Sequence, residues 1–299
     1  MNTMLNRARQ RAEGGSVESR PQADVPRLFP ATIGRFDDPS DRAVIDGLVR
    51  WVEERYRAEL LERPSKHVYL RTLPDAVIER IDRLRDGPLI RALIAARVPA
   101  GSVIAPMTHT DELYLSHYNK DRGGDQGLFD RHYDGNLRFL QGSVVVRALI
   151  YLQSDATYKV VFHDSKVEKA FATYDFGLLD FHRELHWVEG QYNPADRQRI
   201  LLKCNYLVTP SGAALLGRAA LAANTGVFYV VKAAMEYSKS PRTPPQVAVG
   251  HLCNLFRRLN NIHPLVPLAL IAATVGALAA ALAAALAAAI GWAIGSLLT

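Results

Sequence analysis

The chain has 299 residues, with 36 Lys and Arg against 30 Asp and Glu, a formal charge of +6 and a hydrophobic fraction of 48%. These averages exclude a collagen, a coiled coil and a wholly disordered chain, and the positive charge is too small and too scattered to indicate nucleic-acid binding. The two cysteines, Cys204 and Cys253, cannot form a disulfide framework. A reducing, cytosolic environment is therefore the simpler expectation.

The first 100 residues predict a flexible arm followed by helices. Residues 1–30 are rich in Arg, Gln, Glu, Gly and Ser, show no apolar repeat, and contain no visible secretory signal. An apolar stripe then runs from Ala43 to Tyr56 at helical spacing, and a second helical pattern covers Ala76 to Ala96. Residues 31–100 are expected to be helices that support a sheet.

From residue 101 to residue 210, short runs of β-branched and aromatic residues alternate with clusters of Gly, Asp and Asn. The runs are ELYLSHY, NLRFL, SVVVRALIYL, YKVVFH, GLLDF and RILLKCNYLV. Short strands at this spacing predict a sandwich or barrel, so the fold class is mainly β with flanking helices, α+β. Residues 211–262 predict a helical extension, which is interrupted at SPRTPPQ.

The segment from Pro264 to Thr299 contains no charged residue and consists largely of Ala, Leu, Ile and Val. As a helix it would span about 54 Å, against about 30 Å for the hydrocarbon core of a bilayer. Arg257 and Arg258 precede it and Trp292 lies near its far end, as expected for residues at membrane interfaces. Residues 264–299 therefore predict a single-pass tail anchor with the folded part in the cytosol. The alternative is an Ala-rich helix packed inside the protein.

One group of residues has the pattern of a metal site. In FDRHYDGNLRF, His132 and Asp134 are separated by one residue, so on a strand both side chains would lie on the same face. Downstream, LLDFHRELHWVEG contains His182 and His186. Two histidines and one carboxylate make the facial triad that leaves three positions of an octahedral iron open. The next strand, RQRILLKCNYLV, carries Arg197, Arg199 and Lys203 as candidate partners for an acid.

In this order, the motifs resemble those of the Fe(II)/2-oxoglutarate-dependent dioxygenases, specifically the prolyl 4-hydroxylase-like superfamily. The resemblance covers roughly Tyr114 to Tyr206 and includes LYLSHYNKDRGGDQGLFDRHYDGN, ALIYL, DFGLLDFHRELHWVEG and RQRILLKCNYL. It implies a double-stranded β-helix, or jelly-roll, core over residues 101–210. Together with the helices of residues 31–100, this core would form a dioxygenase domain over residues 31–210.

The resemblance also assigns the metal ligands. His132, Asp134 and His186 match the three iron ligands of the family. Periodicity alone does not choose between His182 and His186, because their four-residue spacing would place both on one strand face. The family pattern has its ligand just before the Glu-Gly turn, which favours His186.

Three further residues match the cosubstrate site. Arg199 best matches the anchor of 2-oxoglutarate, because the run ILLKCNYL that follows Arg199 aligns with the closing strand of the family. Arg197 is the near rival, since the loop QYNPADRQ makes the gap from His186 longer than usual. Tyr118 resembles the tyrosine that hydrogen-bonds the cosubstrate carboxylate, although an ordinary core aromatic is an equal alternative.

The resemblance implies an enzyme that uses Fe(II), 2-oxoglutarate, O2 and ascorbate to hydroxylate an unactivated C–H, with a protein side chain such as proline as the expected substrate. The chain has SDATYKVVF where many members carry a Gly-Gly-x-Thr-x-Phe turn, which leaves a peptide and a small-molecule substrate both open. Two alternatives remain: a non-catalytic jelly-roll binding module on a membrane, and a dioxygenase that acts on a lipid or small metabolite.

Overall fold

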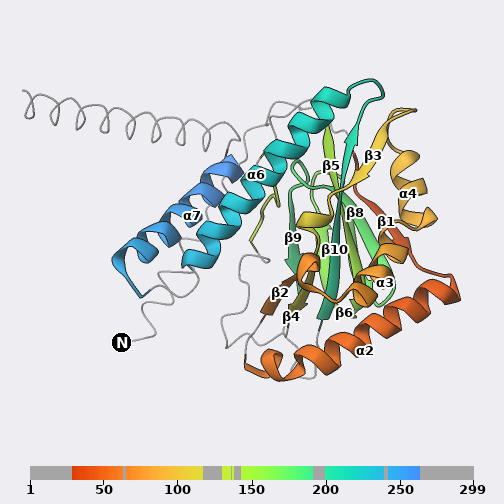
Figure 1. Ribbon diagram of the computed structural model, residues 1–299, viewed down its shortest axis with the longest axis horizontal. Helices are drawn as coiled ribbons and strands as arrows, with labels where there is room; N and C mark the ends of the chain where they lie inside the picture. The colour runs from red at the N-terminus through yellow and green to blue at the C-terminus, as the bar shows by residue number, and fades with distance from the viewer. Residues whose placement is uncertain are drawn as a thin grey trace, which may run out of the picture.

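The computed structural model describes residues 29–62, 65–116, 130–135, 137, 143–190, 199–238 and 242–262. Mainly antiparallel strands with flanking helices make up this part of the chain, as the sequence predicted (Figure 1). Most of the expected N-terminal arm and the whole charge-free tail lie outside the described residues, as do Tyr118 and Arg197.

The strands are β1 (Thr32–Arg35), β2 (Ser65–Tyr69), β3 (Val103–Pro106), β4 (Glu112–Ser116), β5 (Val144–Gln153), β6 (Asp155–Phe162), β7 (Val167–Ala172), β8 (Asp175–Asp180), β9 (His186–Glu189) and β10 (Arg199–Thr209). The helices are α2 (Pro39–Glu62), α3 (Asp75–Arg85), α4 (Pro88–Ala95), α6 (Ala214–Ser238) and α7 (Pro244–Ile262), with short 3-10 turns η1 (Leu70–Thr72) and η2 (Thr108–Thr110).

The strands form two sheets. The larger sheet has the order β1-β8-β5-β10-β4-β2, with β3 also paired to β10, and the smaller has the order β7-β6-β9. After β5 the chain passes to the small sheet for β6 and β7, returns for β8, crosses again for β9 and returns for β10. This alternation between two antiparallel sheets is consistent with the expected jelly roll.

Side chains alternate across the large sheet, and β10 shows the alternation most clearly. Its even-numbered residues join the core beneath α2, α3 and α4: Ile200, Leu202, Cys204, Tyr206 and Val208. Its odd-numbered residues have the opposite orientation, and Leu201 packs there with Tyr114 of β4 and Phe162 of β6. The space between the two sheets is therefore a second, separate interior.

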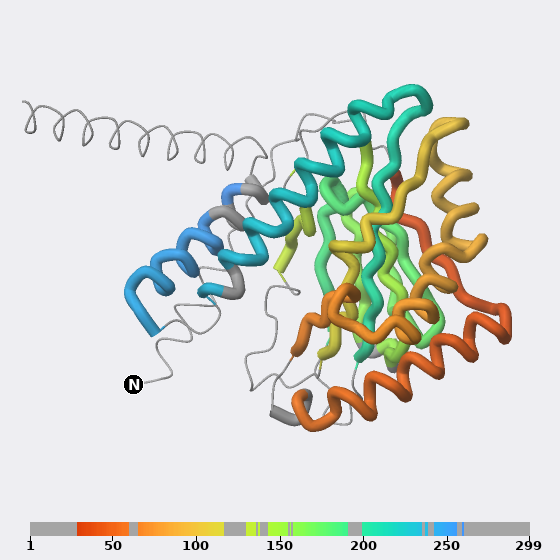
Figure 2. Tube along the Cα trace, in the orientation of Figure 1, coloured from red at the N-terminus to blue at the C-terminus, as the bar shows by residue number. Residues whose placement is uncertain are grey.

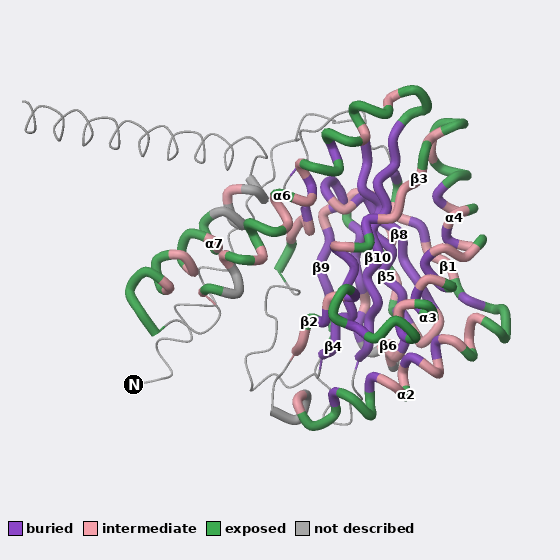
Figure 3. The backbone as a smooth tube through the Cα atoms, in the orientation of Figure 1, coloured by how far each residue is buried: buried purple, intermediate pink, exposed green. Residues whose placement is uncertain are grey.

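Helices α6 and α7 lie side by side at the end of the sheets away from α2 (Figures 1 and 2). Ala220 of α6 is buried against Met107, Val145 and Leu207, so α6 is attached to the rim of the barrel. Figure 3 shows that most of the remaining surface of α6 and α7 is exposed or half-buried, whereas the strands β4, β5, β8 and β10 are almost entirely buried. Within the described residues, one stretch is long and apolar enough to cross a membrane, Ala214–Ala234 of α6.

Two expectations about local structure were wrong. The region expected to be helical also contains β1 and β2, which pair with β8 and β4. The helix expected over Ala76–Ala96 is two helices, α3 and α4. Gly87 separates them in an extended conformation, and Pro88 begins α4 because the first turn of a helix needs no amide hydrogen from that position.

The expected strand DFGLLDFHRELHWVEG was also wrong, and the correction affects the site. It is divided between β8 in the large sheet and β9 in the small sheet, with a turn between them. Asp180 stabilises this turn by accepting hydrogen bonds from the backbone amides of His182 and Arg183 at 3.0 and 3.1 Å. His182 and His186 therefore do not share a strand face.

Candidate metal centre

The H-x-D segment is attached to the small sheet at one point. The H-x-D spacing predicted a regular strand at His132, and this was wrong. His132 instead makes an isolated antiparallel bridge to His186, the first residue of β9. Each backbone amide of this pair donates to the other residue's carbonyl oxygen at 3.0 Å. The two imidazole rings consequently lie 4.5 Å apart, although 54 positions separate them in sequence.

Asp134 completes the cluster. Its Oδ1 lies 3.6 Å from Nε2 of His132, and its Oδ2 lies 3.6 Å from Nε2 of His186. One ligand atom from each of the three residues falls within 4.8 Å of the other two. The side chains of His132, Asp134 and His186 are 12%, 18% and 7% exposed, so a small ion could reach the cluster while bulk water is largely excluded.

The backbone fixes which nitrogen each histidine offers. Nδ1 of His132 lies 2.7 Å from the carbonyl oxygen of Asp130, and Nδ1 of His186 lies 3.1 Å from that of Glu184. A carbonyl oxygen only accepts, so in the neutral ring Nδ1 carries the hydrogen and Nε2 keeps its lone pair. Both lone pairs are therefore available beside Asp134, which is the orientation that metal-binding histidines require.

The charges in the cluster also suit a cation. Burial lowers the pKa of His186 to about 4, so this imidazole is neutral at neutral pH. Burial alone would raise the pKa of Asp134, but Arg147 and His186 outweigh it and hold the pKa well below its usual range. Burial also disfavours the charged form of His132, yet the nearby carboxylate of Asp134 raises its pKa. The cluster thus has one carboxylate whose charge attracts a cation.

His182 supports the H-x-D segment instead of joining the cluster. Its Nδ1 accepts the backbone amide of Leu137 at 3.2 Å, so the hydrogen is on Nε2, which donates to Oδ1 of Asn224 on α6 at 2.6 Å. Burial lowers the pKa of His182 to about 3, and the ring stays neutral. A Cβ on Gly135 would lie 1.9 Å from this ring, which explains why glycine follows Asp134.

Arg147 is a site residue that the sequence analysis missed. It lies on β5, where its Nη1 donates to Oδ2 of Asp134 at 2.7 Å and its Nε donates to Oδ1 of Asn205 at 3.0 Å. The guanidinium also lies 4.1 Å from the ring centroid of Phe181. The available signal was a single cation inside the apolar run SVVVRALIYL, because a charge on a buried strand needs a partner.

Two cations of β10 lie on the interior face. Arg199 donates from Nε to Oγ of Ser116 at 3.3 Å, and its guanidinium lies 5.7 Å from the ring centroid of Tyr114. Lys203 is paired with Oε1 of Glu112 at 2.9 Å. Burial alone would raise the pKa of Glu112, but Lys203 and His67 outweigh it and lower the pKa. The charge of Lys203 is thus balanced within the protein.

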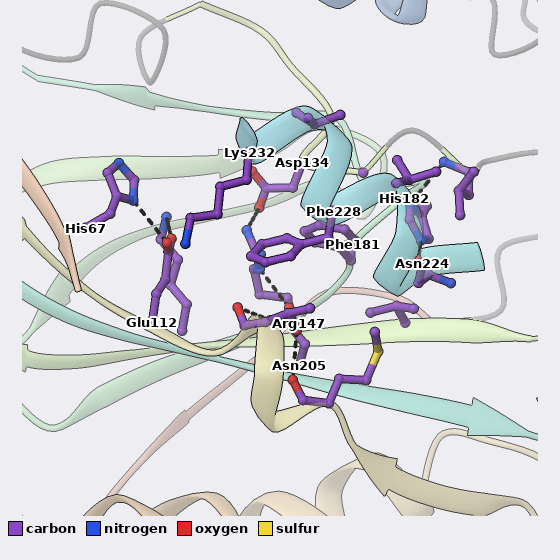
Figure 4. Close-up of a pocket in the computed structure, with 18 of the residues that line it drawn as sticks. His67, Glu112, Asp134, Arg147, Phe181, His182, Asn205, Asn224, Phe228 and Lys232 are labelled. Atoms are coloured by element: carbon purple, nitrogen blue, oxygen red, sulfur yellow. Dashed lines mark hydrogen bonds and ion pairs between the residues drawn. The ribbon is translucent and has the colours of Figure 1, made fainter. Parts of the chain in front are cut away.

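A cavity of about 580 Å³ adjoins the cluster (Figure 4). Its polar wall includes Asp134, Arg147, Lys203 and Glu112, and α6 closes it with Val227, Phe228, Val231 and Lys232. Figure 4 shows Phe228 and Phe181 beside Arg147, and the His182–Asn224 contact at the side of the cavity. A polar wall next to the cluster and an apolar wall on α6 make this a binding cavity for a ligand with both kinds of surface.

Comparison with solved structures finds distant likenesses. A collagen prolyl hydroxylase of Paramecium bursaria Chlorella virus-1 is 10% identical over 64% of this chain and 98% of that chain, with a TM-score of 0.40. A prolyl 4-hydroxylase of Phytophthora capsici is 14% identical over 80% and 72%, with a TM-score of 0.41. HygX of Streptomyces hygroscopicus, with nickel and 2-oxoglutarate bound, is 14% identical over 62% and 84%, with a TM-score of 0.36.

No family model matches the sequence, and no curated protein matches it either. The likenesses to solved structures are weak, with identities of 10–14% and TM-scores of 0.36–0.41 for these three.

Proposed function

We propose that the chain is an Fe(II)- and 2-oxoglutarate-dependent dioxygenase that hydroxylates an unactivated C–H bond. The observation that carries the proposal is the convergence of His132, Asp134 and His186, with both Nε2 lone pairs beside one ionised carboxylate. Two neutral imidazoles and one carboxylate are the donor set of non-haem ferrous oxygenases. The residues present therefore fit Fe(II).

When bound, ferrous iron with 2-oxoglutarate and O2 supplies oxidative decarboxylation coupled to C–H hydroxylation. The protein's part is to hold the ligands and exclude water. The backbone carbonyls of Asp130 and Glu184 keep the two imidazoles in the tautomer that binds metal. Arg147 binds Oδ2 of Asp134, which orients the carboxylate and keeps it ionised.

Arg199 is proposed to anchor the far carboxylate of 2-oxoglutarate. It is buried on the interior face of β10, and its planar guanidinium can bind a carboxylate through two hydrogen bonds. Lys203, which shares that face, is already paired with Glu112. The roles of Arg197 and Tyr118 stay predictions from the resemblance, as does the requirement for ascorbate.

The resemblance implies that the substrate is a protein side chain such as proline. A second candidate is a lipid or small metabolite, which the apolar wall of the cavity favours. Val227, Phe228 and Val231 of α6 form that wall. The chemistry at the metal centre would be the same for either substrate.

The first experiment measures iron binding and the conversion of 2-oxoglutarate to succinate. We expect the purified chain to bind Fe(II) and to form succinate, and His132→Ala and Asp134→Ala to abolish both. His163→Ala is the matched control, because His163 is exposed, lies just beyond β6 and is not part of the cluster. Activity that survives in the cluster variants would contradict the proposal, and a chain without iron would favour a non-catalytic binding module.

We also propose that residues 264–299 tether the protein to a membrane, with the catalytic domain on the cytosolic side. The absence of charge over 36 residues is the sequence feature that supports this. Deletion of the segment should move the protein from the membrane fraction to the soluble fraction and leave iron binding intact. Continued membrane association of the deletion variant would place the anchor elsewhere.

A further inference from the structure

Helix α6 has two apolar faces, and the residues that the structure describes cover one of them. On the covered face, Ala220 and Asn224 are 4% and 7% exposed and contact the rim of the barrel. On the other face, Leu215 and Val230 are 82% and 70% exposed. A surface helix normally has charged or polar residues on the side away from the core.

The exposed face is continuous and uncharged. Its residues follow one another at intervals of four and three, as expected for one side of an α-helix, and all of them are exposed. They are Leu215, Ala219, Ala222, Gly226, Val230, Ala233 and Tyr237. We name these seven residues the outer stripe of α6. Water around this stripe would meet about six turns of helix without a charged side chain.

Two features of the sequence indicate what covers the outer stripe. Residues 210–262, which contain α6 and α7, include six Lys or Arg, of which Lys232 lines the cavity, and one acidic residue, Glu236. The uncharged segment of residues 264–299 follows α7 directly. Basic and apolar side chains together favour a surface that has both anionic head groups and hydrocarbon.

We propose that the outer stripe of α6 lies on the surface of a bilayer that contains anionic lipids, as a second membrane contact besides the tail. The exposed Val247, Leu252 and Leu255 of α7 would extend this contact. The opposite face of α6 holds the helix on the barrel through Ala220 and Asn224, so α6 lies along the membrane and does not cross it. A tail alone would leave the domain free to rotate, whereas two contacts fix its orientation.

This orientation has a consequence for the cavity. Val227 and Phe228 of the same helix line it, so the cavity that borders Asp134 would be separated from the lipid by the width of α6. The proposal concerns only where the helix lies and does not depend on the reaction. Its test is therefore independent of catalytic activity.

The experiment measures contact between the stripe and lipid in the full-length chain. A nitroxide is attached at Val230→Cys in a Cys253→Ala background, with the buried Cys204 left in place. Ala58→Cys on α2 is the matched control, because Ala58 is exposed and α2 lies at the far side of the large sheet (Figure 1). In vesicles of phosphatidylcholine and phosphatidylglycerol, EPR power saturation compares collisions with O2 and with a water-soluble nickel chelate.

We expect the label at Val230→Cys to collide more with O2 and the label at Ala58→Cys to collide more with the chelate. The difference should shrink when phosphatidylglycerol is omitted, and an unchanged difference would overturn the role of anionic lipid. Equal access of the chelate to both labels would overturn the proposal. A label shielded from both reagents would also overturn it, because protein would then cover the stripe.

Flotation of the same vesicles separates this proposal from the tail anchor. Chains that float while the label at Val230→Cys stays in water would refute docking of α6 and leave the tail anchor intact. Chains that do not float would refute both.

Discussion

The two faces of the large sheet differ in what they bury. The face beneath α2, α3 and α4 is apolar, and β10 contributes Ile200, Leu202 and Cys204 to it. The interior face buries Arg199 and Lys203 from the same strand. Buried charges add little net stability even when they are paired, since each must be removed from water. The comparison shows that one face of the strand stabilises the fold while the other holds groups suited to ligands.

The largest expected effect is on Fe(II) affinity, from a substitution at the metal cluster in the interior between the two sheets. His186→Ala removes one of three ligands, so we expect Fe(II) affinity to fall by more than about 100-fold, since loss of a residue that only supports a ligand costs 10- to 100-fold. Calorimetric titration under anaerobic conditions measures this affinity. The circular dichroism spectrum should stay unchanged, and a variant that binds iron normally would remove His186 from the site.

A substitution on the face of the large sheet beneath α2, α3 and α4 should lower stability and leave iron binding unchanged. Leu202→Ala deletes buried methyl groups beneath the helices, so we expect the free energy of unfolding to fall by about 2–5 kcal/mol. Urea denaturation of the metal-free protein gives this value. Iron affinity measured under native conditions should not change, and a large loss of affinity would show that the two faces are not independent.

Arg147 tests how far the interior face supports the metal ligands. Arg147→Met removes the hydrogen bond to Oδ2 of Asp134, so we expect Fe(II) affinity to fall by about 10- to 100-fold. Arg147→Lys should retain part of the affinity because it keeps the charge. Lys159→Met, on the exposed side of β6, is the control that should leave binding unchanged. Wild-type affinity in Arg147→Met would mean that Asp134 needs no such support.

The smallest expected effect concerns pH. The folded pKa of His182 is lowered to about 3 by burial, so the unfolded chain takes up a proton near pH 6.5 that the folded protein does not. This proton uptake destabilises the folded state by less than about 0.1 kcal/mol at pH 7.5, and the destabilisation grows as pH falls, reaching about 1.4 kcal/mol at pH 5.5.

His182→Gln should therefore lose less stability than the wild type between pH 7.5 and pH 5.5. Urea denaturation of the two metal-free proteins at both pH values measures the difference. Equal losses in the two proteins would show that His182 is protonated in the folded state.

Much of the fold was predictable because its signals are local. The helical stripe of α2 and the long strands β5 and β10 follow from spacing and side-chain type. The strands β1 and β2 have only four and five residues, and pairing with β8 and β4 defines them, so no local pattern identifies them. The break at Gly87 had a visible signal in Pro88, which the helical spacing on either side obscured.

In the candidate site, too, local sequence patterns identify some residues and miss those whose roles depend on contacts in the folded chain. His132, Asp134 and His186 were predicted by motif, and the structure brings all three together. The support from His182 to Asn224 joins residues 42 positions apart, on a turn and a helix whose contact only the folded chain defines. Arg147 was missed because its partner Asp134 lies 13 positions away on a segment without regular structure.

The proposed iron and 2-oxoglutarate site is tested most directly by an anaerobic titration of the full-length chain, first with Fe(II) and then with 2-oxoglutarate. We expect one Fe(II) to bind to each chain, and 2-oxoglutarate binding to require the iron and to weaken strongly in Arg199→Met. Binding of Fe(II) that is unaffected by His132→Ala, or a failure of the iron-loaded protein to bind 2-oxoglutarate, would contradict the proposed site.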